Sequence, residues 1–519
     1  MKDTTVNPIH IALDKNFDSE FCGSLPLHLV NLIQPHGLLL VLDKMEFRII
    51  QVSQNVGPYF SVAPEALLEL PLSAFIPAEQ FADIQAKFSD NPGQEKIPFS
   101  LTFSIGGKEV SFTALVHPKE AYILIELEEN TIPAKEHSFI RLYQQIKYST
   151  SLLKQAAGLE AVASLMAREI KDLTQFDRVL VYQFDPQWNG IVIAQAKEAD
   201  MEDFLHLRFP ASDVPKQARD LYYRNPYRLI PTRSYEPVGM VPVVNPLSQR
   251  FTDLSDCNLR SVARVHLEYL GNMHVMASMS LPIIIDERLW GLISCHHKTP
   301  KNPNYELRSA LELLTGIFSA QMAAREKEAA MHLRVQLQAV FSRLLEQLYH
   351  QESLSEGLLS GDTTLLDLFQ LSGAALLFEG SVWTSGQTPG HQEMKELAYW
   401  LRRQQADKVF TTNALPSLYA RARDYKESGS GLMAIAINPE QGEYLLGFRP
   451  EVLQTIEWGG NPHQAIQMEA DGKTYHPRNS FATYQETVRY TARPWMPEEL
   501  ETAAALRSTL LEKIVKDNY

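Results

Sequence analysis

Alternating hydrophobic and polar residues predict a small domain in the first 130 residues of the chain. His36–Val56 has the pattern of two strands joined by a turn at Asp43–Lys44. Three further strands are expected in residues 97–129, with a hairpin turn at Gly106–Gly107 between the first two. Short strands with tight connections predict an α/β domain built on an antiparallel sheet.

Helical and strand patterns alternate in residues 131–323. Apolar residues at helical spacing predict helices near Phe139–Thr150 and Leu159–Leu173. Arg178–Ala196 then has the pattern of strand, loop and strand, and Ser278–Lys301 has that of a strand pair with a charged turn at Asp286–Arg288. This region is therefore expected to form a second α/β domain.

A long helix is predicted after the second domain. Apolar residues keep helical spacing from Leu311 to Leu348, and no proline occurs between Pro303 and Pro389. A single helix of about 40 residues exceeds the usual globular length. Such a helix is typical of a link between two domains that signals or dimerises.

A third α/β domain is expected in residues 324–505. Its strand patterns are Ala374–Gly380, Gly431–Pro439 and Glu443–Pro450. An excursion at about residues 451–490 contains a turn signal at Asp471–Gly472. Pro497, followed by two glutamates, predicts the start of a terminal amphipathic, coiled-coil-like helix within residues 496–519.

Composition limits the class of protein. With 519 residues the chain is long enough for three or four domains, and 45% hydrophobic with 21% charged residues is typical of a globular protein. A net charge of −14 disfavours non-specific binding to nucleic acid or anionic membranes. Three cysteines, no signal peptide and no membrane-spanning stretch predict a cytoplasmic protein.

The stretch FPASDVPKQARDLYYRNPYR, Phe209–Arg228, suggests a binding site. It combines Asp213 with Tyr222, Arg224 and Arg228. Arginine forks bind carboxylates through two hydrogen bonds, and tyrosines provide flat apolar walls with a polar tip. A planar ligand that carries carboxylates would suit this set. The plainer alternative is a turn followed by a solvated amphipathic helix.

A second cluster follows in Leu259–Ser280 and the nearby SCHH motif. It supplies the polar side chains Arg260, His266, Tyr269, Ser278, Ser280 and His296. In a helix, His266 and Tyr269 would share a face. His296 and His297 would point to opposite faces of a strand, which makes them a poor pair of metal ligands.

Cys22 is a further candidate for chemistry, close to the amino terminus. A thiolate near a mobile end of the chain could reach a ligand that another domain holds, and it would attack an electron-poor double bond. Taken alone, a single cysteine is more often a small buried hydrophobe. Cys257 and Cys295 are interpreted as structural.

Six motifs in order resemble those of a bacteriophytochrome photosensory core module. They are IQPHG at residues 33–37, DVP with QARDLYYRNPYRL at 213–229, LRSVARVHLEYLGNM at 259–273, WGLISCHH at 290–297, WGG at 458–460 and PRNSF at 477–481. The resemblance covers nearly the whole chain. It implies three consecutive PAS/GAF-like domains: PAS in residues 1–130, GAF in 131–323 and PHY in 324–505, with a tongue at about 451–490.

The resemblance implies a red/far-red photoreceptor that binds biliverdin IXα in the GAF domain. The residues implied as chromophore contacts are Tyr182, Phe209, Asp213, Val214, Pro215, Tyr222, Arg228, Arg260, His266, Tyr269, Ser278, Ser280 and His296. Arg228, Arg260, Tyr222 and the two serines would hold propionates, and His296 would bind the D-ring carbonyl. Cys22 is implied as the covalent thioether link, because Val265 occupies the linking position of plant and cyanobacterial relatives.

Signalling residues are implied as well. In the family, the aspartate at Asp213 pairs with the arginine at Arg478, and the tongue that carries Trp458, Arg478 and Ser480 refolds from hairpin toward helix. The resemblance implies a parallel homodimer and an output module, such as a histidine kinase or diguanylate cyclase, in the full-length protein. The photosensory module itself is not expected to be an enzyme.

Two other functions are compatible with the sequence. One is a PAS/GAF sensor of a diffusible ligand such as a cyclic nucleotide, because GAF-like folds accept many ligands. The other is a metal-dependent hydrolase that uses His266, His296 and Asp213. The sequence has no recognisable zinc-ligand spacing and no nucleophile elbow, which disfavours the hydrolase.

Overall fold

The computed structural model describes residues 27–90, 96–105, 107–130, 139–464, 466–468 and 475–517. Cys22 and the turn signal at Asp471–Gly472 lie outside these residues. The chain divides into two compact units, which are described separately. Of the described residues, one unit contains those up to Ala323 together with Glu457–Tyr484, and the other contains those in Ala324–Ile456 and Gln485–Tyr519.

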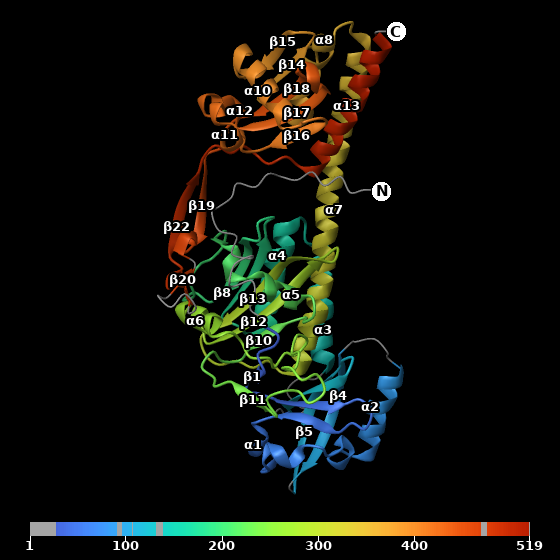
Figure 1. Ribbon diagram of the computed structural model, residues 1–519, viewed down its shortest axis with the longest axis vertical. Helices are drawn as coiled ribbons and strands as arrows, with labels where there is room; N and C mark the ends of the chain where they lie inside the picture. The colour runs from blue at the N-terminus through green and yellow to red at the C-terminus, as the bar shows by residue number, and fades with distance from the viewer. Residues whose placement is uncertain are drawn as a thin grey trace. The chain divides into compact units, whose positions relative to one another are not determined.

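The amino-terminal part of the first unit is built on a seven-stranded sheet (Figure 1), in the order β1-β11-β3-β2-β6-β5-β4. Its strands are β1 (Leu32–Ile33), β2 (Leu38–Asp43), β3 (Ile49–Ser53), β4 (Ile97–Ile105), β5 (Lys108–Pro118), β6 (Tyr122–Glu129) and β11 (Val238–Val241). Helices α1 (Val56–Phe60) and α2 (Ala78–Asp90) accompany it. The five predicted strands are confirmed, and every pair among them is antiparallel.

Strands β1 and β11 were not predicted. They are short, and β11 comes from a later part of the chain, where Leu32 pairs with Gly239 and Met240 with Ser53. The buried Gln34 side chain donates to the Leu229 carbonyl at 3.0 Å. The amino-terminal segment is thereby fixed to the domain that contains the predicted ligand residues.

The second sheet has eight strands, in the order β10-β12-β13-β7-β8-β9-β19-β22. The strands before residue 300 are β7 (Arg178–Phe184), β8 (Gly190–Lys197), β9 (Arg208–Phe209), β10 (Arg228–Ile230), β12 (Ala277–Ile285) and β13 (Arg288–His297). The helices are α3 (Phe139–Gln155), α4 (Leu159–Thr174), α5 (Lys216–Tyr222) and α6 (Arg264–Asn272). The predicted helices and strand pairs of this region are confirmed. Helix α4 packs on β7 and β8, and its buried residues join one core cluster with Leu314 and Phe318.

The long helix is also confirmed. Helix α7 (Tyr305–His350) has 46 residues and is uninterrupted (Figure 1). Its first half belongs to the first unit, and its second half begins the other unit.

The second unit is built on a five-stranded sheet in the order β15-β14-β18-β17-β16. Its strands are β14 (Gly373–Phe378), β15 (Ser381–Gly386), β16 (Val409–Thr412), β17 (Gly431–Asn438) and β18 (Glu443–Arg449). Its helices after α7 are α8 (Leu354–Leu359), α9 (Leu365–Phe369), α10 (His391–Arg403), α11 (Leu415–Leu418), α12 (Lys426–Gly429) and α13 (Pro497–Asp517). Pro497 begins α13, as predicted.

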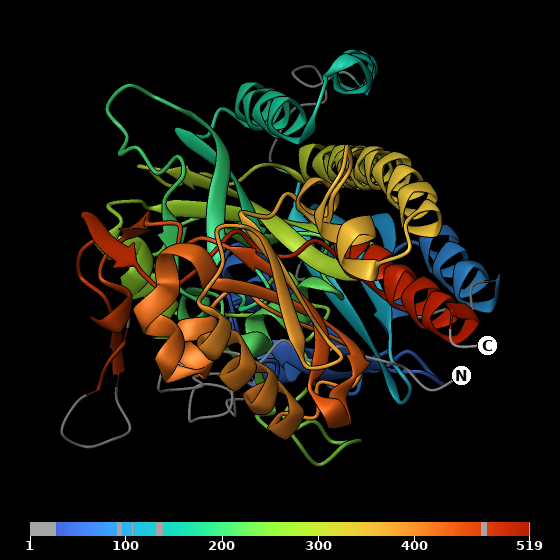
Figure 2. The same cartoon turned by 90° about the horizontal axis from the view of Figure 1, so that it is seen from above.

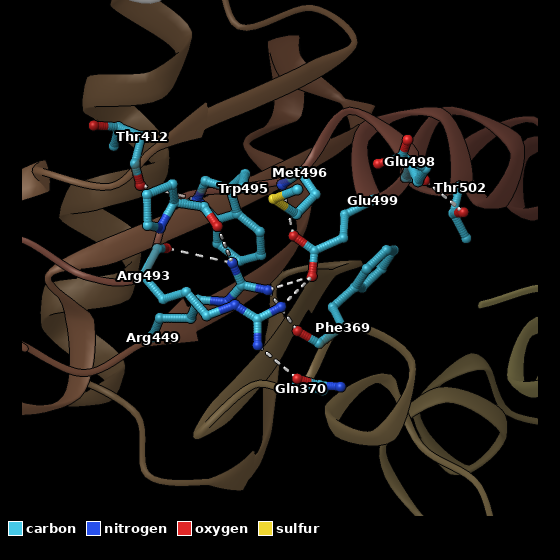
Figure 3. A network of polar contacts seen from close by, with 11 residues as sticks. Phe369, Gln370, Thr412, Arg449, Arg493, Trp495, Met496, Glu498, Glu499 and Thr502 are labelled. Atoms are coloured by element: carbon cyan, nitrogen blue, oxygen red, sulfur yellow. Dashed lines mark hydrogen bonds and ion pairs between the residues drawn. The ribbon is translucent and has the colours of Figure 1, made fainter. Parts of the chain in front are cut away.

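Both faces of this sheet are covered. One core cluster joins it to the second half of α7 and to α13, which lie side by side (Figures 1 and 2), and another joins it to α10. A buried ion pair between Arg449 at the end of β18 and Glu499 fixes the first turn of α13 (Figure 3).

The excursion at residues 451–490 is a hairpin. It contains β19 (Gln454–Gly459), β20 (Ile466–Met468), β21 (Tyr475–Pro477) and β22 (Thr483–Val488). Strand β20 pairs antiparallel with β21, and Trp458 of β19 pairs with Arg208 of β9. The hairpin thus extends the sheet that carries the ligand residues.

Candidate functional site

A cavity of about 250 Å³ lies in the first unit, and residues of β12, β13, α5 and α6 line it. Its wall includes every candidate contact that the sequence placed in the second domain: Tyr182, Phe209, Asp213, Val214, Pro215, Tyr222, Arg228, Arg260, His266, Tyr269, Ser278, Ser280 and His296. Leu27 and Val30 of the amino-terminal segment also line it. Residues distant in sequence therefore converge on one cavity.

One end of the cavity is cationic and hydroxyl-rich. The antiparallel register of β10 and β12 places Arg228 opposite Ser280, and Tyr222 is hydrogen-bonded to the same serine. Arg228 donates to the Asn258 carbonyl at 2.9 Å, and Arg260 donates to the Leu27 carbonyl at 2.9 Å. Both guanidinium groups therefore donate hydrogen bonds to neutral carbonyl oxygens.

No ion pair is recorded for Arg228 or Arg260 among the described residues, and Nε of Arg260 has no hydrogen-bond partner there. Burial lowers the pKa of both side chains, and the Arg228 charge helps to lower that of Arg260 to about 9. Buried charges are normally paired. This end of the cavity therefore fits the carboxylates of a ligand.

Aromatic side chains form the other end. Rings of Tyr182 and Phe209 lie 6.1 Å apart, and Tyr269 meets Phe481 edge-on at 5.0 Å. His266 stacks on Tyr269 with 9° between the ring planes, because α6 places residues three apart on one face, as predicted. Burial lowers the pKa of His266 to about 4, so its imidazole is neutral near pH 7.

His296 completes the cavity wall from β13. Its ring is buried, and its Nε2 lies 3.2 Å from the Ser294 hydroxyl. The next residue, His297, points the other way and contacts Asp177 at 2.8 Å. The predicted alternation is confirmed. No group of three His, Cys, Asp or Glu side chains that could hold a metal ion occurs in the described part of the chain.

Asp213 connects the cavity to the hairpin. It ends a short turn, Ala211–Asp213, and its Oδ2 accepts hydrogen bonds from the Tyr269 hydroxyl at 2.8 Å and from Nη2 of Arg478. The Asn272 side chain also donates to the Arg478 carbonyl at 3.0 Å. Burial raises the pKa of Asp213, and the two donors oppose that rise.

The other hairpin residues differ in their surroundings. Trp458 is buried, whereas Ser480 is exposed and its hydroxyl accepts a hydrogen bond from the Ala482 amide at 3.2 Å. Gly460 has φ +94°, and a side chain there would collide with the Ser480 carbonyl and the Arg478 side chain. The bend at this glycine therefore allows Arg478 to lie against the turn.

Some functional residues were missed in the sequence. Arg178 contacts His296, Ser294 lines the cavity, and Pro477 reaches it from the hairpin. An arginine at the start of an apolar strand gives no signal by itself, because its partner lies 118 residues away. Cys257 and Cys295 are free and buried, and burial raises the pKa of both thiols, which makes them unreactive.

Three family profiles match the chain: "PAS fold" at residues 22–130, "GAF domain" at 158–325 and "Phytochrome region" at 337–518. No helix in the described residues is long and apolar enough to span a membrane. The domain boundaries drawn from the sequence stay predictions.

Similar proteins cover nearly the whole chain. Cyanobacterial phytochrome B of Nostoc sp. is 38% identical over 96% of this chain and 67% of its own length. A bacteriophytochrome of Xanthomonas campestris is 30% identical over 99% of this chain and 80% of its own length. The chain thus spans about two thirds of the Nostoc protein.

Two solved structures have the same fold. The bacteriophytochrome RpBphP3 of R. palustris superposes with a TM-score of 0.86 at 34% identity, covering 95% of this chain and 99% of that one. The photosensory core module of the Stigmatella aurantiaca phytochrome gives 0.85 at 34% identity, covering 96% and 98%. The chain therefore belongs to the phytochrome family, and it is the photosensory core of a light photoreceptor whose pigment is a bilin.

Proposed function

We propose that this chain is a red/far-red photoreceptor that holds biliverdin IXα in the cavity described above, with Cys22 as the covalent link. The observation that carries the proposal is the pair Arg228 and Arg260. Both are buried at one end of a cavity whose other end is aromatic, and neither has an acidic partner among the described residues. A long planar ligand with carboxylates at one edge and a carbonyl at the far end satisfies both ends.

The position of the amino-terminal segment supports the role of Cys22. Leu27 lines the cavity and accepts a hydrogen bond from Arg260, and Cys22 precedes it by five residues. Five residues of extended chain span at most about 18 Å, a length that would allow a thiol at position 22 to reach the cavity. Its sulfur would add across a vinyl double bond, forming one S–C bond, with the thiol proton ending on the neighbouring carbon.

A bound bilin supplies the absorption of red light and the rotation of its D ring. His296 would donate a hydrogen bond to the D-ring carbonyl, and Tyr182, Phe209 and Tyr269 would form the walls around that ring. Tyr269 lines the cavity and also donates to Asp213. A displacement of Tyr269 would therefore weaken the site at which Asp213 holds Arg478.

Release of Arg478 would free the hairpin. A strand rises about 3.3 Å per residue and a helix about 1.5 Å, so refolding of the hairpin toward helix shortens it and pulls on the chain that leads to α13. An output module beyond α13 and a parallel homodimer complete the proposal. Exposed apolar side chains on α3 and α7 support a dimer: Ile140, Tyr143, Tyr148, Leu313, Met331 and Val335. The predicted location is the cytoplasm.

The test is an absorption spectrum after biliverdin is added, in darkness and after red light. We expect a red band that shifts to the far red on illumination, and zinc-induced fluorescence of the pigment on a denaturing gel. Cys22→Ser should abolish that fluorescence. Fluorescence retained by Cys22→Ser would place the link elsewhere, and a colourless protein would favour a sensor of a diffusible ligand.

A further inference from the structure

Arg178 is a buried cation to which the proposed function assigns no role. It begins β7, its side chain is 1% exposed, and its guanidinium lies 4.0 Å over the ring of Phe204. Its Nη1 donates to the Glu202 carbonyl at 3.2 Å. No ion pair is recorded for it in the residues that the structure describes, so its charge is held by a carbonyl, an aromatic face and one further group.

That further group is the imidazole of His296. The register of β7 and β13 places Arg178 directly opposite His296. Its Nε and Nη2 lie 3.4 and 3.2 Å from Nδ1 of the histidine. Both guanidinium nitrogens therefore approach the same ring nitrogen.

A guanidinium can only donate hydrogen bonds. Nδ1 of His296 must therefore carry its lone pair, since a proton there would point at a cation with no acceptor. Burial and the Arg178 charge both lower the pKa of His296, so the ring is neutral and carries a single proton. That proton then belongs to Nε2.

Nε2 lies on the cavity side. It is 3.2 Å from the hydroxyl of Ser294, which occupies the same face of β13 two residues earlier and also lines the cavity. The hydroxyl can accept the Nε2–H bond when no other acceptor is near. His296 thus presents a donor to any carbonyl oxygen that enters this end of the cavity.

We infer that Arg178 is a positioning residue that locks His296 in its Nε2–H tautomer, and so fixes the direction of the hydrogen bond offered to a ligand carbonyl. The role toward a bilin rests on the proposed function; the tautomer itself does not. Without Arg178, the remaining contact of the His296 ring in the residues described is with the Ser294 hydroxyl, which can donate or accept and so favours neither neutral tautomer. In a share of the molecules, Nε2 would then present a lone pair to the ligand carbonyl.

The first experiment uses the pigment-free protein. Imidazole nitrogen spectra of ¹⁵N-histidine-labelled protein report the tautomer, and a His296→Gln variant assigns the signal among the 15 histidines. We expect only Nε2–H in the wild type, a mixture in Arg178→Met, which keeps an unbranched side chain over Phe204, and recovery of Nε2–H in Arg178→Lys, which again only donates. A pure Nε2–H signal in Arg178→Met, or a mixture in Arg178→Lys, would overturn the inference.

Folding failure does not remove the test. If Arg178→Met does not fold, Arg178→Gln replaces it, because a glutamine amide can also accept and so permits Nδ1–H. The Gln and Lys variants must then differ in tautomer, and identical spectra overturn the inference.

The second experiment adds biliverdin. Arg178→Met should still take up the pigment but show two red-absorbing components, in the proportion of the two tautomers, where the wild type and Arg178→Lys show one. A single component in Arg178→Met would contradict the role toward the ligand. If the wild type takes up no biliverdin, the proposed function fails, whereas the nitrogen spectra still decide the tautomer.

Discussion

Two arginine–carboxylate pairs in this protein are similarly buried but differently supported. In the pair Arg449–Glu499 the side chains are 3% and 2% exposed, and in Arg478–Asp213 they are 4% and 7% exposed. The first joins β18 to α13 in the second unit. The other joins the hairpin to the cavity in the first unit. Burial alone does not distinguish them.

The two pairs differ in how many of their other donor and acceptor atoms are hydrogen-bonded. Arg449 donates to the Phe369 carbonyl at 2.8 Å and to the Pro494 carbonyl at 3.0 Å, and it stacks 3.7 Å from the ring of Trp495 (Figure 3). Glu499 also accepts from the Met496 amide at 2.8 Å. Only Nε of Arg449 is left without a partner in the residues described.

Fewer of the hydrogen-bond donors of Arg478 have partners. Its Nε and Nη1 have no hydrogen-bond partner in the described part of the chain, although the rings of Phe209 and Phe481 lie 5.4 and 4.8 Å away. A buried charge stabilises a fold only when its hydrogen bonds are also made. We conclude that the pair Arg449–Glu499 is a permanent joint, whereas Arg478–Asp213 is a contact that a small displacement can open.

The largest effect is expected from Arg449→Ala. This variant removes the buried partner of Glu499 and leaves its carboxylate only the half-exposed Arg493, at 3.4 Å, as a cation. Loss of the buried partner of a charge costs about 3–5 kcal/mol, and the Arg493 contact keeps the expected cost at the lower end of that range. Amides of α13 should therefore exchange with solvent much faster, because the helix loses its anchor to β18. Hydrogen exchange resolved along the chain measures this free energy of opening.

Arg334→Ala is the matched control. Arg334 on α7 forms an exposed ion pair with Glu501 of α13 at 2.6 Å. Exposed pairs contribute at most about 1 kcal/mol, so α13 should remain protected. If α13 lost equal exchange protection in the two variants, burial and the additional hydrogen bonds of the pair Arg449–Glu499 would contribute nothing to the stability of α13.

A smaller effect is expected from Asp213→Ala. Removal of the carboxylate deletes a charged hydrogen bond worth about 1.5–3 kcal/mol. The loss is limited because Arg478 can leave for water when β20 and β21 detach. Exchange should increase in the hairpin and not in β7, β8 or β13.

Glu268→Ala tests whether any ion pair between α6 and the hairpin would behave in this way. Glu268 contacts His476 at 2.9 Å, and both side chains are about two-fifths exposed at 42% and 41%. We expect little change in hairpin exchange. A hairpin that opens in this control but stays closed in Asp213→Ala would reverse our reading of the two contacts.

The comparison also explains what the sequence could and could not reveal. Local patterns located the strand pairs, the long helix and the start of α13, because each depends on neighbours in the chain. Strands β1, β9 and β11 were missed, because two to four residues carry no period. The joint at Arg449 and the contact of Arg178 with His296 were missed for another reason: each brings together residues far apart in sequence.

The candidate site was largely predictable because family motifs mark it. Periodicity alone placed His266 and Tyr269 on one face of a helix, but it gave no reason to bring Arg478 to Asp213. That contact depends on the hairpin reaching the turn, and its proposed role came from resemblance.

The smallest effect is expected from Tyr269→Phe. It removes one donor at 2.8 Å from Asp213 but keeps the ring beside Phe481, so hairpin opening should ease by about 0.5–1.5 kcal/mol. The pKa of Asp213 is already raised by burial, and loss of this donor should raise it further. A raised carboxyl pKa means that the folded state holds a proton that the unfolded state has released, so its contribution to stability is lost as pH rises through the folded pKa.

The pH at which hairpin protection falls should therefore move upward in Tyr269→Phe. Tyr235→Phe is the control, because the Tyr235 hydroxyl contacts Ser261 at 3.0 Å and has no recorded contact with Asp213 in the residues described. Exchange of hairpin amides across pH, with this control subtracted, isolates the carboxylate. If the pH midpoint of hairpin protection stays in place or moves downward, Arg478 alone sets the charge of Asp213. The contact Arg478–Asp213 would then resemble the permanent joint Arg449–Glu499.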